Sequence, residues 1–320
     1  MAMALDPFLV SVFFIMLSLM FVFWAADLIV LGITSYARRL GLSDYITGLV
    51  VVAMAASMPE VIASMTALVA GREDVLFGTI LGTNMVHIAL VPGLLAVLGR
   101  KVEIESTILA KALLPLWVVL MIPFVLIAID GELGRTDGIV LLLLFCLYLV
   151  WLWNQEKKLG LMKKSVRVKT LWRDSFIFLG SLIVLLIAGQ TLVFSSITFA
   201  GIVGIPAYFL AITIIAVGGA LPDLAVGIKS VTQGHGDVGV GDILGSIAIE
   251  FLLFFGMVGI FHPIRIAVGE VFNVMVFLTI GLTLLLYFVH KQVMTWKNGI
   301  VLLALYALFM LVEIYKVVRV

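Results

Sequence analysis

Two carboxylates directly follow a proline, each inside a long apolar stretch of this 320-residue chain: Glu60 after Pro59, and Asp223 after Pro222. Proline has no backbone N–H, so it interrupts a helix and frees a carbonyl oxygen in the preceding turn. Within a bilayer such a break is tolerated only in the protein interior or beside a water-filled cavity. Carboxylate and carbonyl oxygens are the ligands that Ca²⁺ prefers. The two motifs therefore predict an intramembrane cation site.

Both motifs belong to a sequence repeat. Residues 48–87 reappear as residues 211–250 without a gap, at an offset of 163. The alternative to a functional repeat is a duplication kept only for packing, but most of the identical pairs are polar or helix-breaking residues. These pairs are Gly41/Gly204, Tyr45/Tyr208, Ala53/Ala216, Pro59/Pro222, Gly71/Gly234, Asp74/Asp237, Val75/Val238, Gly78/Gly241, Ile80/Ile243, Leu81/Leu244 and Gly82/Gly245.

Hydroxyl and titratable side chains occur at one-turn spacing in two other apolar stretches. Thr83 and His87 are four residues apart, as are Ser246 and Glu250, so each pair shares one helix face. His87 and Glu250 occupy equivalent positions of the repeat, and we expect them to face each other. The alternatives are a packed structural histidine and a capping or interfacial role for Glu250.

Other residues near the two carboxylates could add ligands. Ser57 lies one turn before Glu60, and Gly219, four residues before Asp223, exposes its backbone carbonyl. Glu313 lies near the end of the last apolar stretch. We expect Glu313 to be solvated and to lie outside the site.

The composition is that of a polytopic membrane protein. Hydrophobic residues make up 63% of the chain and charged residues 12%, against roughly 45–50% apolar residues in a soluble domain. A bilayer core about 30 Å thick needs about 20 apolar residues per crossing. We predict ten transmembrane helices near residues 8–33, 43–70, 75–99, 106–129, 136–153, 174–197, 206–231, 239–262, 267–289 and 297–315.

A basic loop at residues 154–173 divides the chain into halves of five helices each, residues 1–153 and 174–320. Because five is an odd number, the second half enters the membrane inverted relative to the first. Most of the 20 Lys and Arg fall on the side of this loop, which places the loop in the cytoplasm and both termini outside. We therefore predict an all-α polytopic membrane protein whose ten transmembrane helices form two inverted five-helix repeats, with a site near the midplane.

Glycine spacing predicts close helix packing beside the site. The motifs Gly78-x-x-x-Gly82 and Gly241-x-x-x-Gly245 place small residues on one face of a helix. Such faces let helix backbones approach each other closely in a membrane.

At the motifs AASMPE with GTNMVH, and GGALPD with GSIAIE, the chain resembles the cation/calcium exchanger superfamily. This membrane family of sodium/calcium exchangers and related cation antiporters carries two inverted repeats. Each repeat has a Gly-Thr-Ser-x-Pro-Glu-like motif and a Gly-Ser-Asn-x-x-Asn/Asp-like motif. The resemblance implies metal-ligand positions at Ala53, Ala56, Ser57, Glu60, Thr83, His87, Ala216, Gly219, Ala220, Asp223, Ser246 and Glu250.

The chain departs from the family pattern at several of these positions. Ala56, Gly219 and Ala220 replace hydroxyl residues, and Asp223 replaces a glutamate. His87 and Glu250 stand where the family has Asn or Asp, so the site gains titratable groups and loses neutral oxygens. These changes bear directly on sodium coupling and on the identity of the divalent ion.

The resemblance implies an antiporter, not an enzyme, that exchanges Ca²⁺ or a related cation against Na⁺ by alternating access. One alternative is a cation–proton antiporter that uses the His87–Glu250 pair, because histidine titrates near neutral pH. Another is a cation channel, which needs a continuous pore and no counter-ion. A third is an intramembrane hydrolase with Ser57 or Ser246 as nucleophile and His87 as base.

We expect no cofactor, and Ca²⁺, Na⁺ and H⁺ as the candidate transported ions. The expected partners are inorganic cations and the lipid bilayer, without nucleic acid, and the expected state is a monomer. The expected location is the cell membrane, with several passes and with the N- and C-termini outside.

Overall fold

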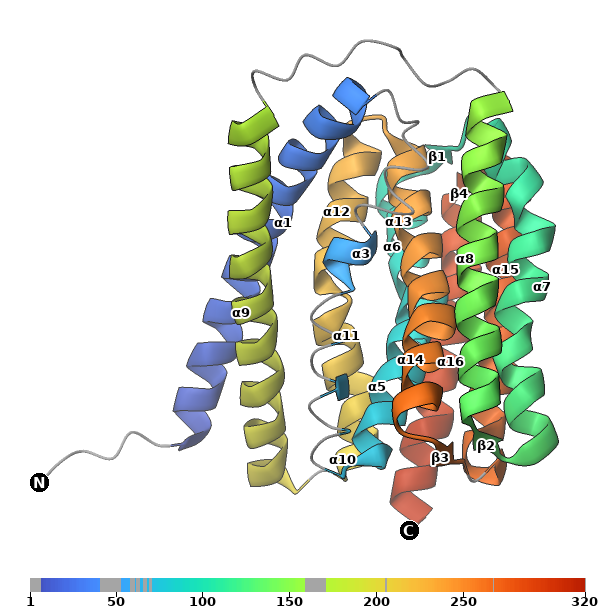
Figure 1. Ribbon diagram of the computed structural model, residues 1–320. Coiled ribbons are helices and arrows are strands. Elements are labelled where there is room, and N and C mark those ends of the chain that lie inside the picture. The colour runs from blue at the N-terminus through green and yellow to red at the C-terminus, as the bar shows by residue number, and fades with distance from the viewer. Residues whose placement is uncertain are drawn as a thin grey trace, which may run out of the picture.

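The computed structural model describes residues 7–40, 53–57, 61, 64–65, 68, 71–158, 171–204, 206–266 and 268–319. Over these ranges the chain forms a bundle of long, roughly aligned helices (Figure 1). Within the described ranges, seven helices are long and apolar enough to cross a membrane: Val75–Gly99, Lys111–Ile129, Arg135–Gln155, Tyr208–Thr232, Gly236–Phe261, Val271–His290 and Trp296–Val318. The predicted helical, polytopic membrane protein is confirmed at this level.

The helices follow one another in two similar series, with π-helical segments denoted η. The first half of the chain contains α1 (Pro7–Leu40), α3 (Ala53–Ala56), α5 (Glu73–Met85), η2 (Val86–Leu90), α6 (Val91–Gly99), α7 (Thr107–Asp130) and α8 (Arg135–Lys158). The second half contains α9 (Leu171–Val203), α10 (Ala207–Leu210), η4 (Ala211–Ile215), α11 (Ala216–Gly219), α12 (Leu221–Thr232), α13 (Gly236–Ala248), η5 (Ile249–Phe254), α14 (Phe255–Phe261), α15 (Val268–His290) and α16 (Trp296–Arg319). Most of the predicted helix at 43–70 lies outside the described residues.

Four short strands in the described part of the chain connect the two halves, and the sequence did not predict them. They are β1 (Lys101–Glu103), β2 (Glu132–Leu133), β3 (Ile264–Arg265) and β4 (Val293–Thr295). β1 pairs antiparallel with β4, and β2 pairs antiparallel with β3, at opposite ends of the bundle (Figure 1). Each pair joins one strand from the first half to one from the second.

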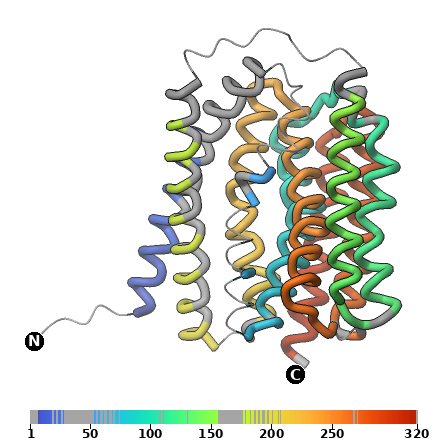
Figure 2. The backbone as a smooth tube through the Cα atoms, in the orientation of Figure 1, coloured from blue at the N-terminus to red at the C-terminus, as the bar shows by residue number. Residues whose placement is uncertain are grey.

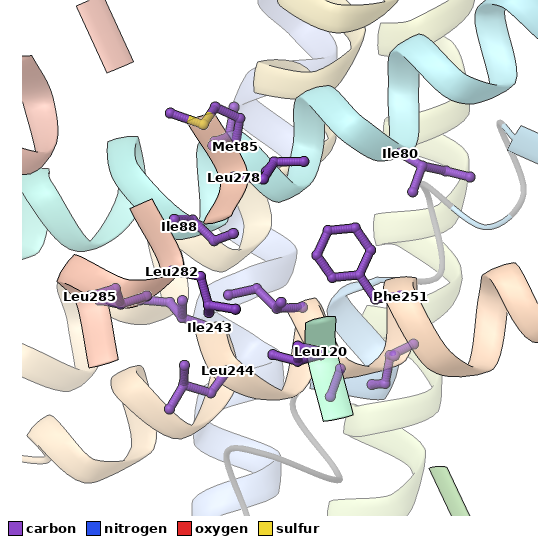
Figure 3. Packing of buried hydrophobic residues seen from close by; sticks show 14 of the residues in the cluster. Ile80, Met85, Ile88, Leu120, Ile243, Leu244, Phe251, Leu278, Leu282 and Leu285 are labelled. Carbon is purple, nitrogen blue, oxygen red and sulfur yellow. The ribbon is translucent and has the colours of Figure 1, made fainter. Parts of the chain in front are cut away.

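The central helices carry the core. The spans Val75–Gly99 and Gly236–Phe261 are mostly buried, whereas Trp296–Val318 is mostly exposed. Large apolar side chains from α13, η5, α7 and α15 interlock there, as Figure 3 shows for Leu120, Phe251 and their neighbours. Because these two spans are mostly surrounded by protein, their polar side chains face protein and not lipid.

The α1–α9 pair forms one side of the bundle, with α12 next to α1 (Figure 2). The described start of α1 and the end of α16 lie at the same end of the molecule, and the end of α8 and the start of α9 lie at the opposite end (Figure 1). The sidedness of the termini and of the 154–173 loop stays a prediction.

Close backbone packing occurs at the first glycine motif. A Cβ atom on Gly82 would lie 2.6 Å from the carbonyl oxygen of Ile212, and one on Gly78 would lie 2.8 Å from Ala211 Cβ. Such distances are shorter than van der Waals contact, so only glycine fits. The predicted close approach is confirmed for this motif. The two glycines allow α5 to pack directly against η4.

Candidate cation-binding site

The second proline motif interrupts its helix as predicted. α11 ends at Gly219, and α12 begins at Leu221, with Pro222 in its first turn. Between them Ala220 has φ −74° and ψ 0°, so the backbone leaves regular helix for one residue. Asp223 lies in the first turn of α12 and is fully buried. The helix dipole favours negative charge at this position.

The first copy has the same local backbone at Ser57, the residue 163 positions before Ala220. The Ser57 N–H donates to the Ala53 carbonyl over 2.9 Å, and the Ser57 carbonyl accepts from Val61 N over 3.1 Å. Ala220 makes the equivalent bonds over 3.1 Å and 3.0 Å. The hydrogen bonds on either side of Ser57 and Ala220 are therefore equivalent in the two copies.

Several of the expected ligand positions hold alanine or glycine, and these residues lie at the ends of the short helices α3 and α11. Ala53 and Ala56 form the ends of the short helix α3, and Ala53 is fully buried. Ala216 and Gly219 form the ends of α11, and both are buried. Pro59 and Glu60, the carboxylate motif of the first copy, lie outside the described residues.

Three titratable side chains meet in the buried centre of the bundle. His87 Nε2 contacts Asp223 Oδ2, and His87 Nδ1 lies 3.4 Å from Glu250 Oε1. At most 2% of any of the three residues is exposed. The prediction that His87 and Glu250 face each other is confirmed, and Asp223 joins them. One imidazole thus lies between two carboxylates.

Glu250 has a second partner that the sequence analysis missed. Asn84 Nδ2 donates to Glu250 Oε2 over 2.6 Å and to the carbonyl oxygen of Ile80 over 2.8 Å. Asn84 is fully buried. The sequence signals are its place between Thr83 and His87 and its match to the Asn of the Gly-Ser-Asn-like motif, whereas the equivalent residue of the second copy is Ile247.

A second missed residue is Asp242, a fully buried carboxylate on α13. It lies four residues before Ser246 and eight before Glu250, so the three share one face of the helix. The same spacing that singles out Ser246 and Glu250 could have identified it.

π-Helical segments position both facing residues. His87 is the second residue of η2, and Glu250 is the second residue of η5. A π-helical turn adds a residue to the helical turn and shifts the side chains that follow, and it occurs often at functional sites. The two segments begin 163 residues apart, like the rest of the repeat.

Three hydroxyl groups at expected ligand positions are also buried. Ser57 and Ser246 are fully buried, and neither hydroxyl has a hydrogen-bond partner within the described ranges. The Thr83 hydroxyl donates to the carbonyl oxygen of Thr79 over 2.7 Å, which leaves its lone pairs available. Buried polar atoms normally have partners, so this set of hydroxyl and carboxylate oxygens fits a hard cation.

Among the described residues, no three His, Cys, Asp or Glu side chains form a group that could hold a metal ion in this arrangement. The reason is geometric: His87 uses opposite ring nitrogens toward Asp223 and Glu250, so the three do not converge on one point. A cation that binds both carboxylates must displace the ring.

One expectation outside the site is wrong. Glu313 is 2% exposed and not solvated, and Lys316 Nζ donates to its Oε1 over 2.6 Å on α16. The two residues are one turn apart, so the lysine supplies a local counter-charge to a buried carboxylate.

The chain is similar to known membrane exchangers over nearly its whole length. The sequence model of the family described as "Sodium/calcium exchanger protein" matches residues 10–154 and 175–315. The chain is 33% identical over 263 residues to the putative antiporter CaxA of Alkalimonas amylolytica, with 80% of this chain and 82% of the relative covered. It is 31% identical over 284 residues to the inner membrane protein YrbG of Escherichia coli, with coverages of 85% and 87%.

The fold is also that of a solved exchanger. A structure of the sodium-calcium exchanger NCX_Mj, soaked with Na⁺ and Sr²⁺, aligns with a TM-score of 0.79 at 23% identity and covers 94% of this chain and 97% of that one. The family consists of transporters and not of enzymes, as the sequence analysis predicted. The fold, the repeated interruption of the helices and the match of both halves lead to one conclusion: this chain belongs to the sodium/calcium exchanger protein family.

Proposed function

We propose that the chain is an alternating-access antiporter that exchanges Ca²⁺ or a related cation against Na⁺. Its relatives include a protein named the sodium/calcium exchanger MaX1 of Methanosarcina acetivorans, 25% identical over 347 residues. We infer the ions that this chain carries from the donor atoms of its site.

The architecture that we propose is two inverted five-helix repeats. The equivalent segments α5 and α13 begin 163 residues apart, as do η2 and η5. The swapped strand pairs β1–β4 and β2–β3 at opposite ends support a two-fold axis in the membrane plane, since such an axis converts one pair into the other. We place the basic loop in the cytoplasm and both termini outside.

The observation that carries the proposal is the buried cluster of His87, Asp223 and Glu250 between two interrupted helices. A carboxylate deep in a bilayer costs at least about 2.5–3.5 kcal/mol and normally marks an ion pathway. Asp223 and Glu250 supply charge, and Ser57, Thr83 and Ser246 supply neutral oxygens. Glu60 is the repeat equivalent of Asp223 and completes the set in this proposal.

Ca²⁺ suits this donor set because it accepts 6–8 oxygen ligands in irregular geometry. Backbone carbonyls of Ala53, Ala56, Ala216 and Gly219, at the two interruptions, are the remaining candidates. Alternating access then requires the interrupted halves to open the site to each side of the membrane in turn.

Protons are a second candidate for the counter-ion, and one observation favours them. The His87 ring lies between the two carboxylates that would bind the cation. A protonated imidazole and a divalent cation would then compete for the same two carboxylates, which is the basis of exchange at a single site. Sodium coupling, in the primary proposal, does not require the imidazole to be protonated.

Transport by purified protein in proteoliposomes tests the proposal. Vesicles loaded with Na⁺ should take up radioactive Ca²⁺, and uptake should cease when Na⁺ is equal on both sides. Uptake that follows an imposed pH gradient and ignores Na⁺ would select the proton-coupled alternative. Uptake that depends on neither gradient would contradict an antiporter and indicate a channel.

A further inference from the structure

We propose that Asn84 determines the cation selectivity of the site by restricting Glu250 to a single free oxygen. This inference rests on the proposed function. The residue lies outside the ligand positions implied by the sequence motifs, and it acts through Glu250 and not by direct contact with the ion.

The hydrogen bonds of Asn84 fix the orientation of its amide. Nδ2 donates to both Ile80 O, over 2.8 Å, and Glu250 Oε2, over 2.6 Å. The carbonyl of Ile80 can only accept a hydrogen bond, so the nitrogen faces it and the orientation of the amide is fixed. The bond to Ile80 ties the side chain to its own helix, and the bond to Glu250 is charge-assisted and therefore strong.

The consequence for Glu250 is that its two oxygens have different surroundings. Oε2 accepts from Asn84, whereas Oε1 faces His87 at 3.4 Å. Oε1 has no hydrogen-bond partner within the described part of the chain. A cation that displaces the imidazole would therefore meet Oε1 first. Bidentate binding would require Oε2 to accept from Asn84 and coordinate the cation at the same time, which favours monodentate binding.

Monodentate and bidentate carboxylates favour different ions. Ca²⁺ accepts 6–8 ligands and often takes both oxygens of one carboxylate, whereas Mg²⁺ requires near-octahedral geometry with single oxygens. By holding Oε2, Asn84 lowers the coordination number that the site offers and narrows the advantage of Ca²⁺ over smaller divalent ions. The repeat position in the second half holds Ile247, so only one half of the site carries this restriction.

The variant Asn84→Ser tests this role with little risk to folding. A serine hydroxyl can donate to the carbonyl of Ile80, as Thr83 does to Thr79, but it is too short to reach Glu250. Freed from Asn84, Glu250 can bind through both oxygens. The ratio of the Mg²⁺ inhibition constant to the Ca²⁺ KM should rise about tenfold in proteoliposome uptake, the factor typical of one charge-assisted hydrogen bond.

Two controls separate positioning from a general structural effect. Asn298→Ser makes the same chemical change at the start of α16, where Asn298 Oδ1 accepts from Thr295 N and Oγ1. This variant should leave the ratio unchanged. In a Glu250→Gln background, which has no carboxylate at this position, Asn84→Ser should have no further effect on the ratio. Equilibrium binding of Ca²⁺ and Mg²⁺ to purified protein gives the same comparison for variants that do not transport.

An unchanged ratio in Asn84→Ser, or a change that persists in the Glu250→Gln background, would overturn the inference. Absence of Ca²⁺ counter-transport by the wild-type protein would instead reject the proposed function. The two failures are thus distinguished by whether the wild-type protein transports Ca²⁺.

Discussion

His87 Nδ1 lies 3.4 Å from Glu250 Oε1, although the two residues are 163 positions apart in the chain. The other ring nitrogen contacts Asp223, which also belongs to the second half. A single side chain of the first half therefore bridges two carboxylates of the second, in the buried centre of the bundle.

Replacement of His87 by alanine should make the protein more dependent on bound cation for its stability. Without the ring, Asp223 and Glu250 lose the group between them, and like charges in a buried site repel each other. A bound divalent cation offsets that repulsion and stabilises the folded state. The increase in melting temperature on addition of Ca²⁺ should exceed that of the wild type by about 3 °C.

The matched control for this prediction is His290→Ala. His290 is exposed at the end of α15, so its removal should leave the Ca²⁺-dependent shift at the wild-type value. Equal shifts in His87→Ala and the wild type would show that the bridge does not compensate the carboxylates.

Replacement of Gly82 by alanine should destabilise the protein. The new Cβ would lie 2.6 Å from the Ile212 carbonyl oxygen and 2.8 Å from Ala216 Cβ, so α5 must move away from η4. Overpacking of this kind costs about 1–3 kcal/mol. The melting temperature in detergent should fall, and transport should fall with it because the packed segment adjoins α11.

Gly180→Ala is the control for the glycine variant. No atom lies within 4 Å of a Cβ at Gly180 in α9, so alanine should be neutral there or stabilise the helix by up to about 1 kcal/mol. If both alanine variants had the same melting temperature, the close approach of α5 and η4 would not contribute to the free energy of unfolding.

Replacement of Lys316 by methionine should destabilise α16. The change leaves the buried Glu313 carboxylate without the lysine that donates to it, and an unpaired buried charge is costly. Because a third of the Lys316 side chain is exposed, solvent screens the pair and we expect a loss of only about 1–2 kcal/mol. Thermal unfolding should show the loss, and adding Glu313→Gln should restore most of it. A double variant as unstable as Lys316→Met alone would contradict the pairing.

The sequence was sufficient to predict the positions of the main helices. The expected helix at 75–99 corresponds to α5, η2 and α6 over 73–99, because a long apolar stretch bounded by charged residues leaves few alternatives. The interruption before Asp223 was also predictable, since proline breaks a helix whatever its surroundings. The contact of His87 with Glu250 followed from the repeat alone.

Other features depend on tertiary packing and could not be read from local patterns. The π-helical segments η2 and η5 have no sequence signature, although they aim His87 and Glu250 at the site. The bond from Asn84 to Glu250 joins residues 166 positions apart. Comparison of the two repeats did not indicate it, because the second copy has Ile247 at the position of Asn84. Glu313 was misassigned because its position near a helix end says nothing of the helices that cover it.

Ca²⁺ uptake driven by a Na⁺ gradient in proteoliposomes, compared between the wild type and Asp223→Asn, tests whether Asp223 binds the transported cation. We expect at least a hundredfold loss of uptake, since the amide supplies neither the charge nor the second acceptor oxygen that a buried cation needs. Asp137→Asn is the control, because Asp137 accepts from Gly134 N at the start of α8, and it should transport like the wild type. Full activity of Asp223→Asn would contradict a cation site at the interrupted helix.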